Sequence, residues 1–564
     1  MKRKSAKKLK TFVAGTVLAM GVSVPYHVLA ETPVIPISAE AVEIQQVPLR
    51  QVAEAIGAQV EWNAESGQAT ARRGKHYFTV TPGQTTAEVN GESVTMAEAA
   101  KWSGSTVTVP IDVIKEAFEA NISWSPSTGV LINYNDIVSL TGFILHHAVL
   151  GNSVAGSFMS AQLGAVMPPD DLLVMLAQLS QTLGQPDKLI SVTTNSNGVH
   201  HNVVYTYLTD LEMPMTLTFR YDQNYKLNDF YMPYGVTTNG LYKIPDYDDP
   251  STYTEKEVVL GEGPFQLPGT LTLPNGEGPF PVVVLVHGSG PNDRDEAVGA
   301  YATFRDLAVG LAAQDVAVLR YEKRTREYQF QTFYDSEFTV NKESVDDALA
   351  AVSYLAQEDK IDPDQIFVVG HSQGGMVMPR IIEKDQSGAI AGAVIISSPY
   401  EPLEDIVNWQ MEQRLDMMRD MGVPAEQLEV VEQQKAAWDQ LYAMLKDESA
   451  GVEQLQQAFG AADGYWWADF RNFYAAELAK DQEGPLLIMQ GENDIQVHID
   501  QLDGWKEALA NRQDVEYLQY PNMNHFLVEV DQPSTGMEYE VPGNVSPQLI
   551  NDLADWVKKI AARS

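Results

Sequence analysis

The 564-residue sequence contains no cysteine. Disulfide bonds, a thiolate nucleophile, cysteine zinc sites and a lipid anchor on cysteine are therefore excluded. Basic residues are also scarce, because 38 Lys and Arg stand against 76 Asp and Glu and leave a formal net charge of −38 at pH 7. A surface this acidic repels phosphate backbones and anionic lipids, so we expect no nucleic-acid partner.

Long apolar runs are absent beyond the N-terminus, and we expect no stable membrane insertion. Residues 1–30 have the three parts of a secretory signal peptide. Lysines and one arginine dominate the first ten positions, residues 12–24 are mostly apolar, and residues 28–30 precede an expected cleavage site at Glu31. These features predict a secreted, extracellular protein, with an uncleaved N-terminal anchor as the alternative.

A chain of this length predicts several domains, because a single hydrophobic core stops growing near about 250–300 residues. The segment 246–564 alternates apolar β-branched runs with stretches of helical spacing, which favours an α/β fold with a doubly wound sheet. Two shorter segments precede it, at 31–136 and 137–245. Both have the pattern of small α+β domains.

One stretch organises the last segment: the apolar run 366–369 is followed by Gly370-His371-Ser372-Gln373-Gly374-Gly375. A strand, a tight Gly-x-Ser-x-Gly turn and a helix form a nucleophile elbow, in which small flanking residues leave the serine oxygen exposed. An ordinary strand-to-helix turn is the alternative for a bare motif. Because partners for the serine follow downstream, we predict that Ser372 is a catalytic nucleophile.

Such a serine needs a general base and an acid that orients the base, and in this arrangement they follow in the order Ser, acid, His. Strand-like runs at 485–490 and 515–520 are followed by Asp494 and His525, respectively. We predict Asp494 as the orienting acid and His525 as the general base. Glu492 is the nearest rival acid. His498 is expected to neighbour the turn rather than to act as the base.

An oxyanion hole is the remaining requirement. A β-branched run at 281–286 ends in His287-Gly288-Ser289-Gly290-Pro291. We expect the backbone N–H of Gln373 to be one donor and that of Ser289 or Gly290 to be the other. His287 is interpreted as a packed loop residue.

With these motifs the segment 246–564 resembles the α/β-hydrolases, and among them bacterial esterases with His-Gly-Ser-Gly-Pro, Asp-Arg-Asp, Arg-Tyr-Asp-Lys-Arg and Gly-His-Ser-Gln-Gly-Gly motifs. The third motif reads Arg-Tyr-Glu-Lys-Arg at 320–324, with Glu322 where Asp is usual and Thr325 where Gly is usual. The resemblance implies a serine carboxylesterase. Dienelactone hydrolases and acyl thioesterases are also similar, which leaves the scissile bond open. We expect no cofactor.

About 85 residues with a different pattern interrupt this segment at about 400–484, where α/β-hydrolases carry a helical cap. Long Met- and Gln-rich amphipathic helices are expected here. Met411, Met417, Met418, Trp466 and Trp467 could line an acyl pocket, but for most of them we favour the core of the cap. A cap over the nucleophile implies small to medium ester substrates.

Residues 31–136 contain an internal repeat. Pro48 begins an amphipathic stretch that leads to Trp62, and Pro110 begins a second one that leads to Trp124. Each copy predicts a short helix followed by two strands, and repeated units usually pack together. The segment resembles the copper amine oxidase N-terminal-like domain of exported bacterial proteins. No metal site is expected, because His76 is its only histidine, and a cell-envelope component is a candidate partner.

Residues 137–245 are expected to form helices over 137–158 and from Pro168 to Gly184, followed by strands at 203–207 and 215–219. The segment loosely resembles a domain of unknown function that precedes such hydrolases, in which a helix packs on a curved sheet. The adjacent histidine pairs at 146–147 and 200–201 are interpreted as ordinary surface or core residues. The stretch 242–253 is interpreted as a linker.

We therefore predict a secreted carboxylesterase that works through a Ser-His-Asp triad and an acyl-enzyme. One alternative is a peptidase or amidase of the prolyl-oligopeptidase type, although no propeller repeats precede the hydrolase segment. The other is a catalytically silent envelope-binding protein. Against this alternative, all three triad positions are occupied by suitable residues.

Overall fold

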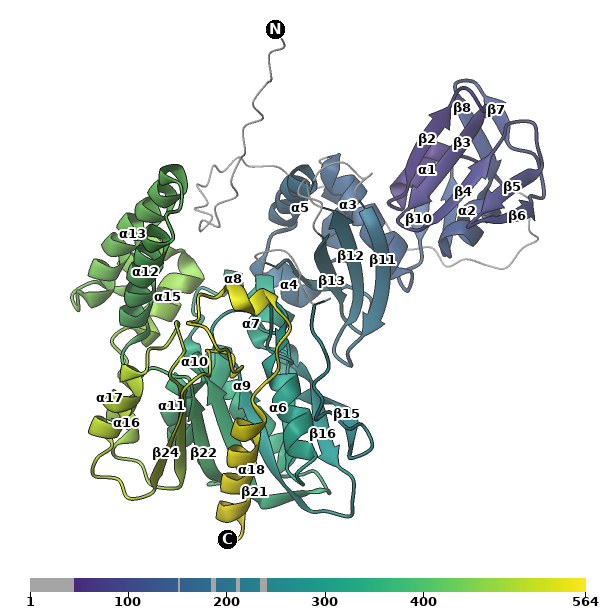
Figure 1. Cartoon of the computed structure of the whole chain (residues 1–564). Coiled ribbons are helices and arrows are strands. Elements are labelled where there is room, and N and C mark those ends of the chain that lie inside the picture. The colour runs from purple at the N-terminus through teal and green to yellow at the C-terminus, as the bar shows by residue number, and fades with distance from the viewer. Residues whose placement is uncertain (1–44, 151–152, 184–188, 209–213, 234–240, 564) are drawn as a thin grey trace.

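The computed structural model describes residues 45–150, 153–183, 189–208, 214–233 and 241–563. The expected signal peptide and residues 31–44 lie outside this part of the chain. The described residues form three modules, which we call the N-terminal module (45–133), the middle module (137–233) and the C-terminal module (241–563) (Figure 1). Among the described helices none combines the length and the apolar character needed to cross a bilayer.

The N-terminal module is built from short antiparallel strands and two helices. Its three sheets have the strand orders β2-β3-β4-β5-β6, β1-β8-β7 and β10-β9. The elements are β1 (Gln46–Pro48), α1 (Leu49–Ala55), β2 (Gln59–Asn63), β3 (Gln68–Arg73), β4 (His76–Val80), β5 (Thr86–Val89), β6 (Glu92–Thr95), β7 (Lys101–Ser103), β8 (Thr106–Pro110), α2 (Ile111–Phe118), β9 (Ile122–Ser125) and β10 (Gly129–Ile132).

The repeat within this module has the expected local structure. Pro48 and Pro110 directly precede α1 and α2, and each helix leads into a hairpin, β2–β3 or β9–β10. The apolar faces of both helices belong to one hydrophobic core. The copies differ in that β2–β3 is extended by three more strands, whereas β9–β10 stays a two-stranded hairpin.

The middle module packs helices on one antiparallel sheet with the order β11-β12-β13-β14. Its elements are α3 (Ile137–Val149), η1 (Ser153–Phe158), α4 (Ala161–Val166), α5 (Pro169–Leu183), β11 (Leu189–Ser196), β12 (His201–Leu208), β13 (Pro214–Tyr221) and β14 (Leu227–Tyr231). The first helix ends at Val149 instead of running to Phe158 as the sequence pattern suggested. β11 was not predicted, because its polar residues show no apolar alternation.

The N-terminal and middle modules meet at two glycines. A Cβ built on Gly57 would lie 2.8 Å from the Cα of Gly142 in α3, and one built on Gly142 would overlap the carbonyl of Ile56. Beside this contact the buried Arg73 donates to the Ile56 carbonyl and to the Ser139 hydroxyl. The two backbones are therefore in direct contact.

The C-terminal module is organised around an eight-stranded sheet with the order β15-β16-β20-β17-β21-β22-β23-β24. β15 and β16 pair antiparallel, and the strands from β20 to β24 are parallel. The strands are β15 (Tyr253–Leu260), β16 (Leu267–Pro274), β17 (Phe280–Val286), β20 (Ala317–Tyr321), β21 (Ile361–His371), β22 (Ile390–Ile396), β23 (Leu486–Gly491) and β24 (Val515–Tyr520), with a small separate pair β18 (Ala297–Val298) and β19 (Tyr301–Ala302).

Helices cover both faces of this sheet, as the doubly wound pattern predicted. Because successive strand residues face opposite ways, Val283 and Leu285 pack against α6 and α18, whereas Val282 and Val284 belong to the core under α9, α11 and α17. The helices and turns are η3 (Gly263–Phe265), α6 (Thr303–Ala312), α7 (Arg324–Glu327), α8 (Gln329–Tyr334), the π-helical turn η4 (Asn341–Val345), α9 (Asp346–Leu355), α10 (Gln373–Met376), α11 (Met378–Lys384), α17 (Asp500–Ala508), η5 (Met537–Glu540) and α18 (Pro547–Ala561).

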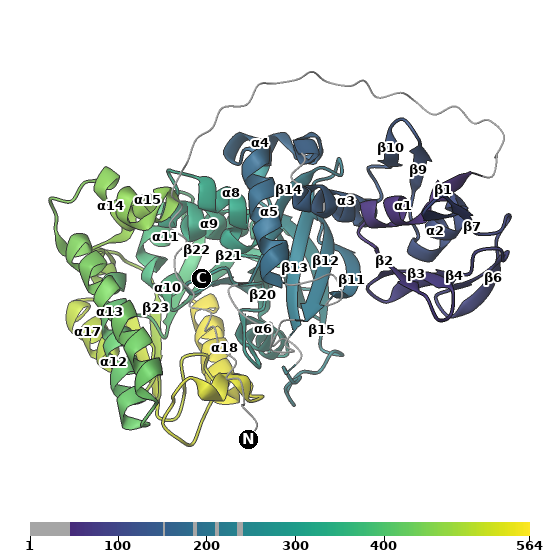
Figure 2. The same cartoon turned by 90° about the horizontal axis from the view of Figure 1, so that it is seen from above.

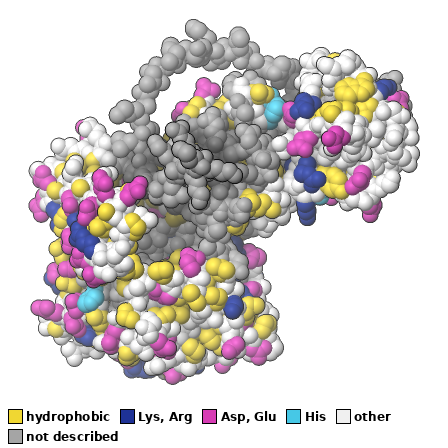
Figure 3. Space-filling view, turned by 45° about the horizontal axis from the view of Figure 1, so that its top comes forward, with side chains coloured by type: hydrophobic (Ala, Val, Ile, Leu, Met, Phe, Trp, Pro, Cys, Tyr) yellow, Lys and Arg dark blue, Asp and Glu magenta, His cyan; other side chains and the backbone are white. Residues whose placement is uncertain are grey.

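The residues between β22 and β23 form a helical cap at one side of the sheet (Figures 1 and 2). Its helices are α12 (Leu403–Asp420), α13 (Ala425–Lys446), α14 (Val452–Phe459), α15 (Ala461–Phe470) and α16 (Ala475–Ala479). Met411 and Trp467 pack in the cap's own apolar cluster, as we expected for most of these side chains. Trp466 instead packs against the core on the face of the sheet that contains Val282 and Val284. Acidic side chains are scattered over the cap, over the rest of the C-terminal module and over the N-terminal module (Figure 3).

The middle module contacts the C-terminal module at α7 and α8. The Glu327 carboxylate is 1% exposed, accepts hydrogen bonds from His200 Nδ1 (2.6 Å) and Asn197 Nδ2 (2.9 Å), and lies 3.3 Å from Arg220 Nε. On the other side of the ring, His200 Nε2 is 2.8 Å from Asn228 Nδ2. His200 is thus a structural contact between modules.

A second carboxylate holds the next helix. Asp229 is fully buried in β14 and accepts the backbone N–H groups of Phe330 and Gln331, the second and third residues of α8. Those donors lack intrahelical partners, so a carboxylate from the neighbouring module takes the place of a helix cap. The Phe230 and Phe330 rings stack alongside.

The Glu327 contact predicts a pH-dependent stability. Burial opposes ionisation, but Arg220 and the His200 hydrogen bond outweigh it and lower the pKa of Glu327 from 4.5 to about 2. The carboxylate therefore contributes about 3 kcal/mol that is complete above about pH 4.5 and is lost as the pH falls towards about 2. In denaturant unfolding Glu327→Gln should be less stable than the wild type at about pH 7, and the difference should shrink at about pH 3.

The matched control is Glu516→Gln, which breaks the exposed ion pair with Lys559 and should change stability by less than about 1 kcal/mol. A constant difference between Glu327→Gln and the wild type across this pH range would contradict the prediction.

Candidate active site

Ser372 lies in a strained turn between β21 and α10. Its backbone has φ 52° and ψ −120°, a conformation that a residue with a side chain rarely adopts. A Cβ at Gly370 would overlap the backbone of Gly374, and a Cβ at Gly374 would overlap the Val286 carbonyl of β17. The two glycines of the motif are therefore required by close backbone contact, and the turn has the geometry expected of a nucleophile elbow.

The structure brings Asp494 and His525 together. Asp494 follows β23 and His525 follows β24, and the distance from His525 Nδ1 to Asp494 Oδ2 is 2.8 Å with both residues buried. The other carboxylate oxygen, Oδ1, accepts the N–H groups of Gln496 and Val497 at 2.8 Å each. Both oxygens are thus fixed, and the carboxylate can hold the His525 proton on Nδ1.

The rival residues lie elsewhere. Glu492 accepts a hydrogen bond from the side chain of Gln519 on an exposed part of the sheet edge. His498 is half-exposed, lies 3.1 Å from Asp500 and packs against Trp409 of the cap. His287 is buried between the rings of Phe304 and Tyr321, and burial lowers its pKa to about 4. His287 is therefore a neutral packed residue, as its loop position suggested.

His371 directly precedes Ser372 in the chain and also contacts His525. His371 Nε2 donates to the backbone carbonyl of His525 at 2.8 Å, and the two imidazole centroids are 4.8 Å apart. In the described part of the chain the Ser372 hydroxyl makes no hydrogen bond to His525. Catalytic hydrogen bonds are commonly long before substrate binds, and they tighten in the complex.

The loop after β17 lies directly against the serine. A Cβ on Gly288 would be 3.2 Å from the Cβ of Ser372, so a larger residue there would crowd the serine. Ser289 and Gly290 follow on the exposed side of this loop. Gln373 begins α10, and its N–H therefore has no partner within the helix. The loop after β17 and the first turn of α10 therefore both adjoin Ser372.

A buried ion pair that sequence reasoning missed joins the loop after β17 to the end of β21. Glu296 Oε1 accepts the Gly288 N–H at 2.7 Å, and Glu296 Oε2 lies 3.0 Å from His371 Nδ1. Burial alone would lower the pKa of His371, but the Glu296 carboxylate outweighs burial and raises it. His371 precedes the predicted nucleophile, yet no spacing rule connects it to a glutamate in a distant loop.

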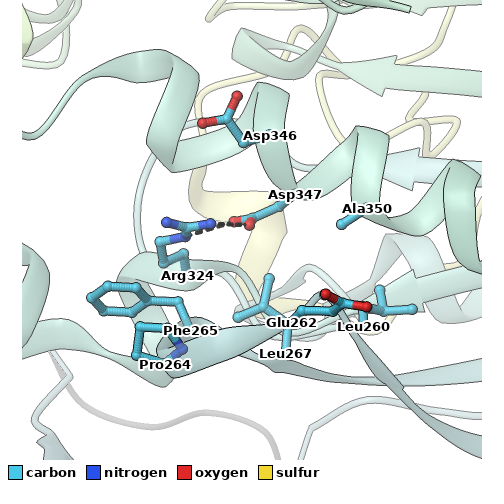
Figure 4. A pocket seen from close by; sticks show the side chains of 10 residues that line it. Leu260, Glu262, Pro264, Phe265, Leu267, Arg324, Asp346, Asp347 and Ala350 are labelled. Carbon is cyan, nitrogen blue, oxygen red and sulfur yellow. Dashed lines mark hydrogen bonds and ion pairs between the residues drawn. The ribbon is translucent and has the colours of Figure 1, made fainter. Parts of the chain in front are cut away.

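The variant motif at 320–324 holds a neighbouring loop. Glu322 accepts from Arg294 Nε at 3.0 Å and lies 3.4 Å from Arg326 Nε. Glu322, which replaces the usual Asp, thus still ties the loop of Asp293–Asp295 to β20. Arg324, the last residue of the motif, pairs with Asp347 beside a cavity of about 260 Å³ (Figure 4). Ser372, Asp494 and His525 are not among the residues that line this cavity.

The described residues contain no cluster of three or more His, Asp or Glu side chains that could hold a metal ion.

Two regions of the chain match known protein families. Residues 43–133 match the family model of the copper amine oxidase N-terminal domain, and residues 283–537 match that of the alpha/beta hydrolase family. The chain is 35% identical over 326 residues to "Esterase EstD" of Thermotoga maritima, a match that covers 57% of this chain and 72% of that protein.

Two solved structures show more distant similarity. An esterase of Pyrococcus furiosus is 16% identical with a TM-score of 0.35, and the match covers 56% of this chain and 96% of that one. An acylaminoacyl peptidase of Pyrococcus horikoshii is 12% identical with a TM-score of 0.34, and the match covers 65% of this chain and 49% of that one.

The acid assignment can be tested by labelling Ser372 with a fluorophosphonate, which reacts with activated serines. Asp494→Asn should slow labelling on the order of 10³–10⁴-fold, because an amide at this position favours the wrong tautomer of His525. Glu492→Gln is the matched control and should label like the wild type. Fast labelling of Asp494→Asn, or slow labelling of Glu492→Gln, would reverse the assignment.

Proposed function

This chain belongs to the alpha/beta hydrolase family and is a carboxylic ester hydrolase, and we propose that it cleaves small to medium acyl esters with Ser372 as the nucleophile. The Ser372 Oγ attacks the ester carbonyl carbon while His525 Nε2 takes its proton. The tetrahedral intermediate expels the alcohol, which receives that proton, and leaves an acyl-enzyme. Water, deprotonated by His525, then releases the acid and frees Ser372.

The observation that carries the proposal is the buried hydrogen bond from His525 Nδ1 to Asp494, beside a serine held at a positive φ. With its proton kept on Nδ1, the His525 Nε2 is left as an acceptor for the serine proton. As the proton arrives, the Asp494 carboxylate stabilises the imidazolium. The proposed oxyanion donors are the N–H of Gln373 and that of Ser289 or Gly290, which together would stabilise the negative carbonyl oxygen.

The cap supports the proposed substrate size. Gln410 of α12 donates to the backbone carbonyl of Gln496, in the turn that carries Asp494. Trp466 of α15 donates to Glu343 beside Gln373. The cap thus contacts the site from two sides, and a compact ester reaches such a serine more readily than a folded polymer does.

We also propose that the protein is exported and that residues 31–136 bind a cell-envelope component. The basic and apolar pattern of residues 1–30 supports export. Trp62 and Trp102 of the N-terminal module are 42% and 52% exposed, and their rings are 5.0 Å apart. Tryptophans exposed as a pair are unusual on a free surface and are typical of binding surfaces.

The nucleophile can be tested with p-nitrophenyl esters from acetate to decanoate, using protein that starts at Glu31. Ser372→Ala should abolish hydrolysis, and the preferred chain length will measure the acyl site. A panel of aminoacyl arylamides and peptides serves as the comparison. Full ester hydrolysis by Ser372→Ala would refute the mechanism, and activity on the amides alone would favour the peptidase alternative.

Envelope binding can be tested by cosedimentation of the same protein with cell envelopes of the producing bacterium. The double variant Trp62→Ala/Trp102→Ala should sediment several-fold less, because the exposed aromatic pair is lost. Its control is Leu131→Ala, which removes another exposed apolar side chain of the module. Equal sedimentation of all three proteins would contradict this role of the pair.

A further inference from the structure

A lysine ammonium is buried next to the loop that follows β17. Lys323 lies between β20 and α7, directly before Arg324, and only 1% of the residue is exposed. Its Nζ donates to the carbonyl oxygen of Gly288 at 2.7 Å and lies 2.8 Å from Glu343 Oε1. Burying two charges is costly, so an ion pair of this kind is weak evidence for a role in stability. Its contacts suggest another role.

The Gly288 carbonyl belongs to the same peptide unit as the Ser289 N–H. Because this unit is planar and trans, its C=O and N–H point in opposite directions. A side chain that fixes the carbonyl therefore fixes the direction of the N–H as well. Asn292 Nδ2 also donates to this carbonyl, at 3.1 Å, while Glu296 holds the N–H of the preceding peptide unit. Both peptide units around Gly288 are thus held by buried charged side chains.

Glu343 extends the arrangement to the other side of the nucleophile. Its second oxygen, Oε2, accepts from the side chain of Gln373 at 3.1 Å and from Trp466 Nε1 at 2.7 Å. Gln373 supplies the other proposed oxyanion donor through its backbone. Glu343 itself lies in the π-helical turn η4, and π-helical turns in proteins are frequent at functional sites. One carboxylate thus connects Lys323, Gln373 and the cap.

We propose that Lys323 and Glu343 are positioning residues that set the oxyanion hole and that select the Ser289 N–H, rather than that of Gly290, as the partner of the Gln373 N–H. The inference rests on the proposed function and deepens it. Lys323 acts through the Gly288–Ser289 peptide unit, and Glu343 holds both Lys323 and the side chain of Gln373. Trp466 makes the same carboxylate sensitive to the position of the cap.

The test compares Lys323→Met, which keeps the length of the side chain without its charge, with Lys323→Met/Glu343→Gln, which leaves no unpaired charge buried. An oxyanion hole acts on the transition state alone, so kcat should fall about 10²-fold while KM changes little. A trifluoromethyl ketone places a negative oxygen in the hole when Ser372 adds to it. Its affinity should fall in parallel with kcat/KM.

Arg324→Met is the matched control. It breaks the neighbouring buried ion pair with Asp347, which faces the cavity of Figure 4. Among the described residues, no hydrogen bond or ion pair joins the Arg324 side chain to the loop after β17. This variant should lower the unfolding midpoint and keep the wild-type kcat. If the Lys323 variants lose kcat only in proportion to their loss of folded protein, and bind the ketone as the wild type does, the inference is wrong.

The Ser372→Ala variant distinguishes failure of this inference from failure of the proposed function. Wild-type kcat in Lys323→Met beside an inactive Ser372→Ala would overturn the inference alone. Activity retained by Ser372→Ala would overturn the proposed function and this inference with it.

Discussion

The tight turn at Ser372 is the constraint on which the rest of the site depends. A non-glycine residue at φ 52° is stable only where its surroundings leave it no alternative, and here the surroundings are backbone atoms of neighbouring strands. Gly374 packs against the carbonyls at the end of β17, so the turn and the loop after β17 cannot move apart independently. The central position of β17 and β21 in the sheet, with β20 and β22 outside them, keeps this spacing rigid.

Around the turn, buried carboxylates form hydrogen bonds and ion pairs that fix the loops lying outside the sheet. Asp494 orients His525, Glu296 connects the loop after β17 to His371, and Glu343 connects Lys323 to Gln373. Each carboxylate has partners on more than one segment of the chain. Such groups cost desolvation energy, but in return they specify direction, because a carboxylate with two or three fixed donors has few orientations left.

The sequence was sufficient wherever function depends on a local pattern. A strand followed by Gly-x-Ser-x-Gly, or by Asp494 at a strand end, places a side chain through the geometry of one element, and the helix–hairpin repeat is equally local. Contacts between distant segments were not predictable. Glu343 and Trp466, Glu296 and His371, and His200 and Glu327 meet only after the sheet and the modules have packed. The polar strand β11 escaped prediction for the same reason, since its partner strand rather than its own composition makes it a strand.

The contact of Gly57 with Gly142 determines how the N-terminal module lies relative to the middle module. Neither position has room for a side chain, and Arg73 is buried beside them with hydrogen bonds to both modules. The joint therefore resembles a packed interior more than a tether, and the N-terminal module is held at a set angle. A molecule captured by that module would orient the whole enzyme, so that the edge of the sheet carrying Ser372 faces a direction fixed relative to the captured surface.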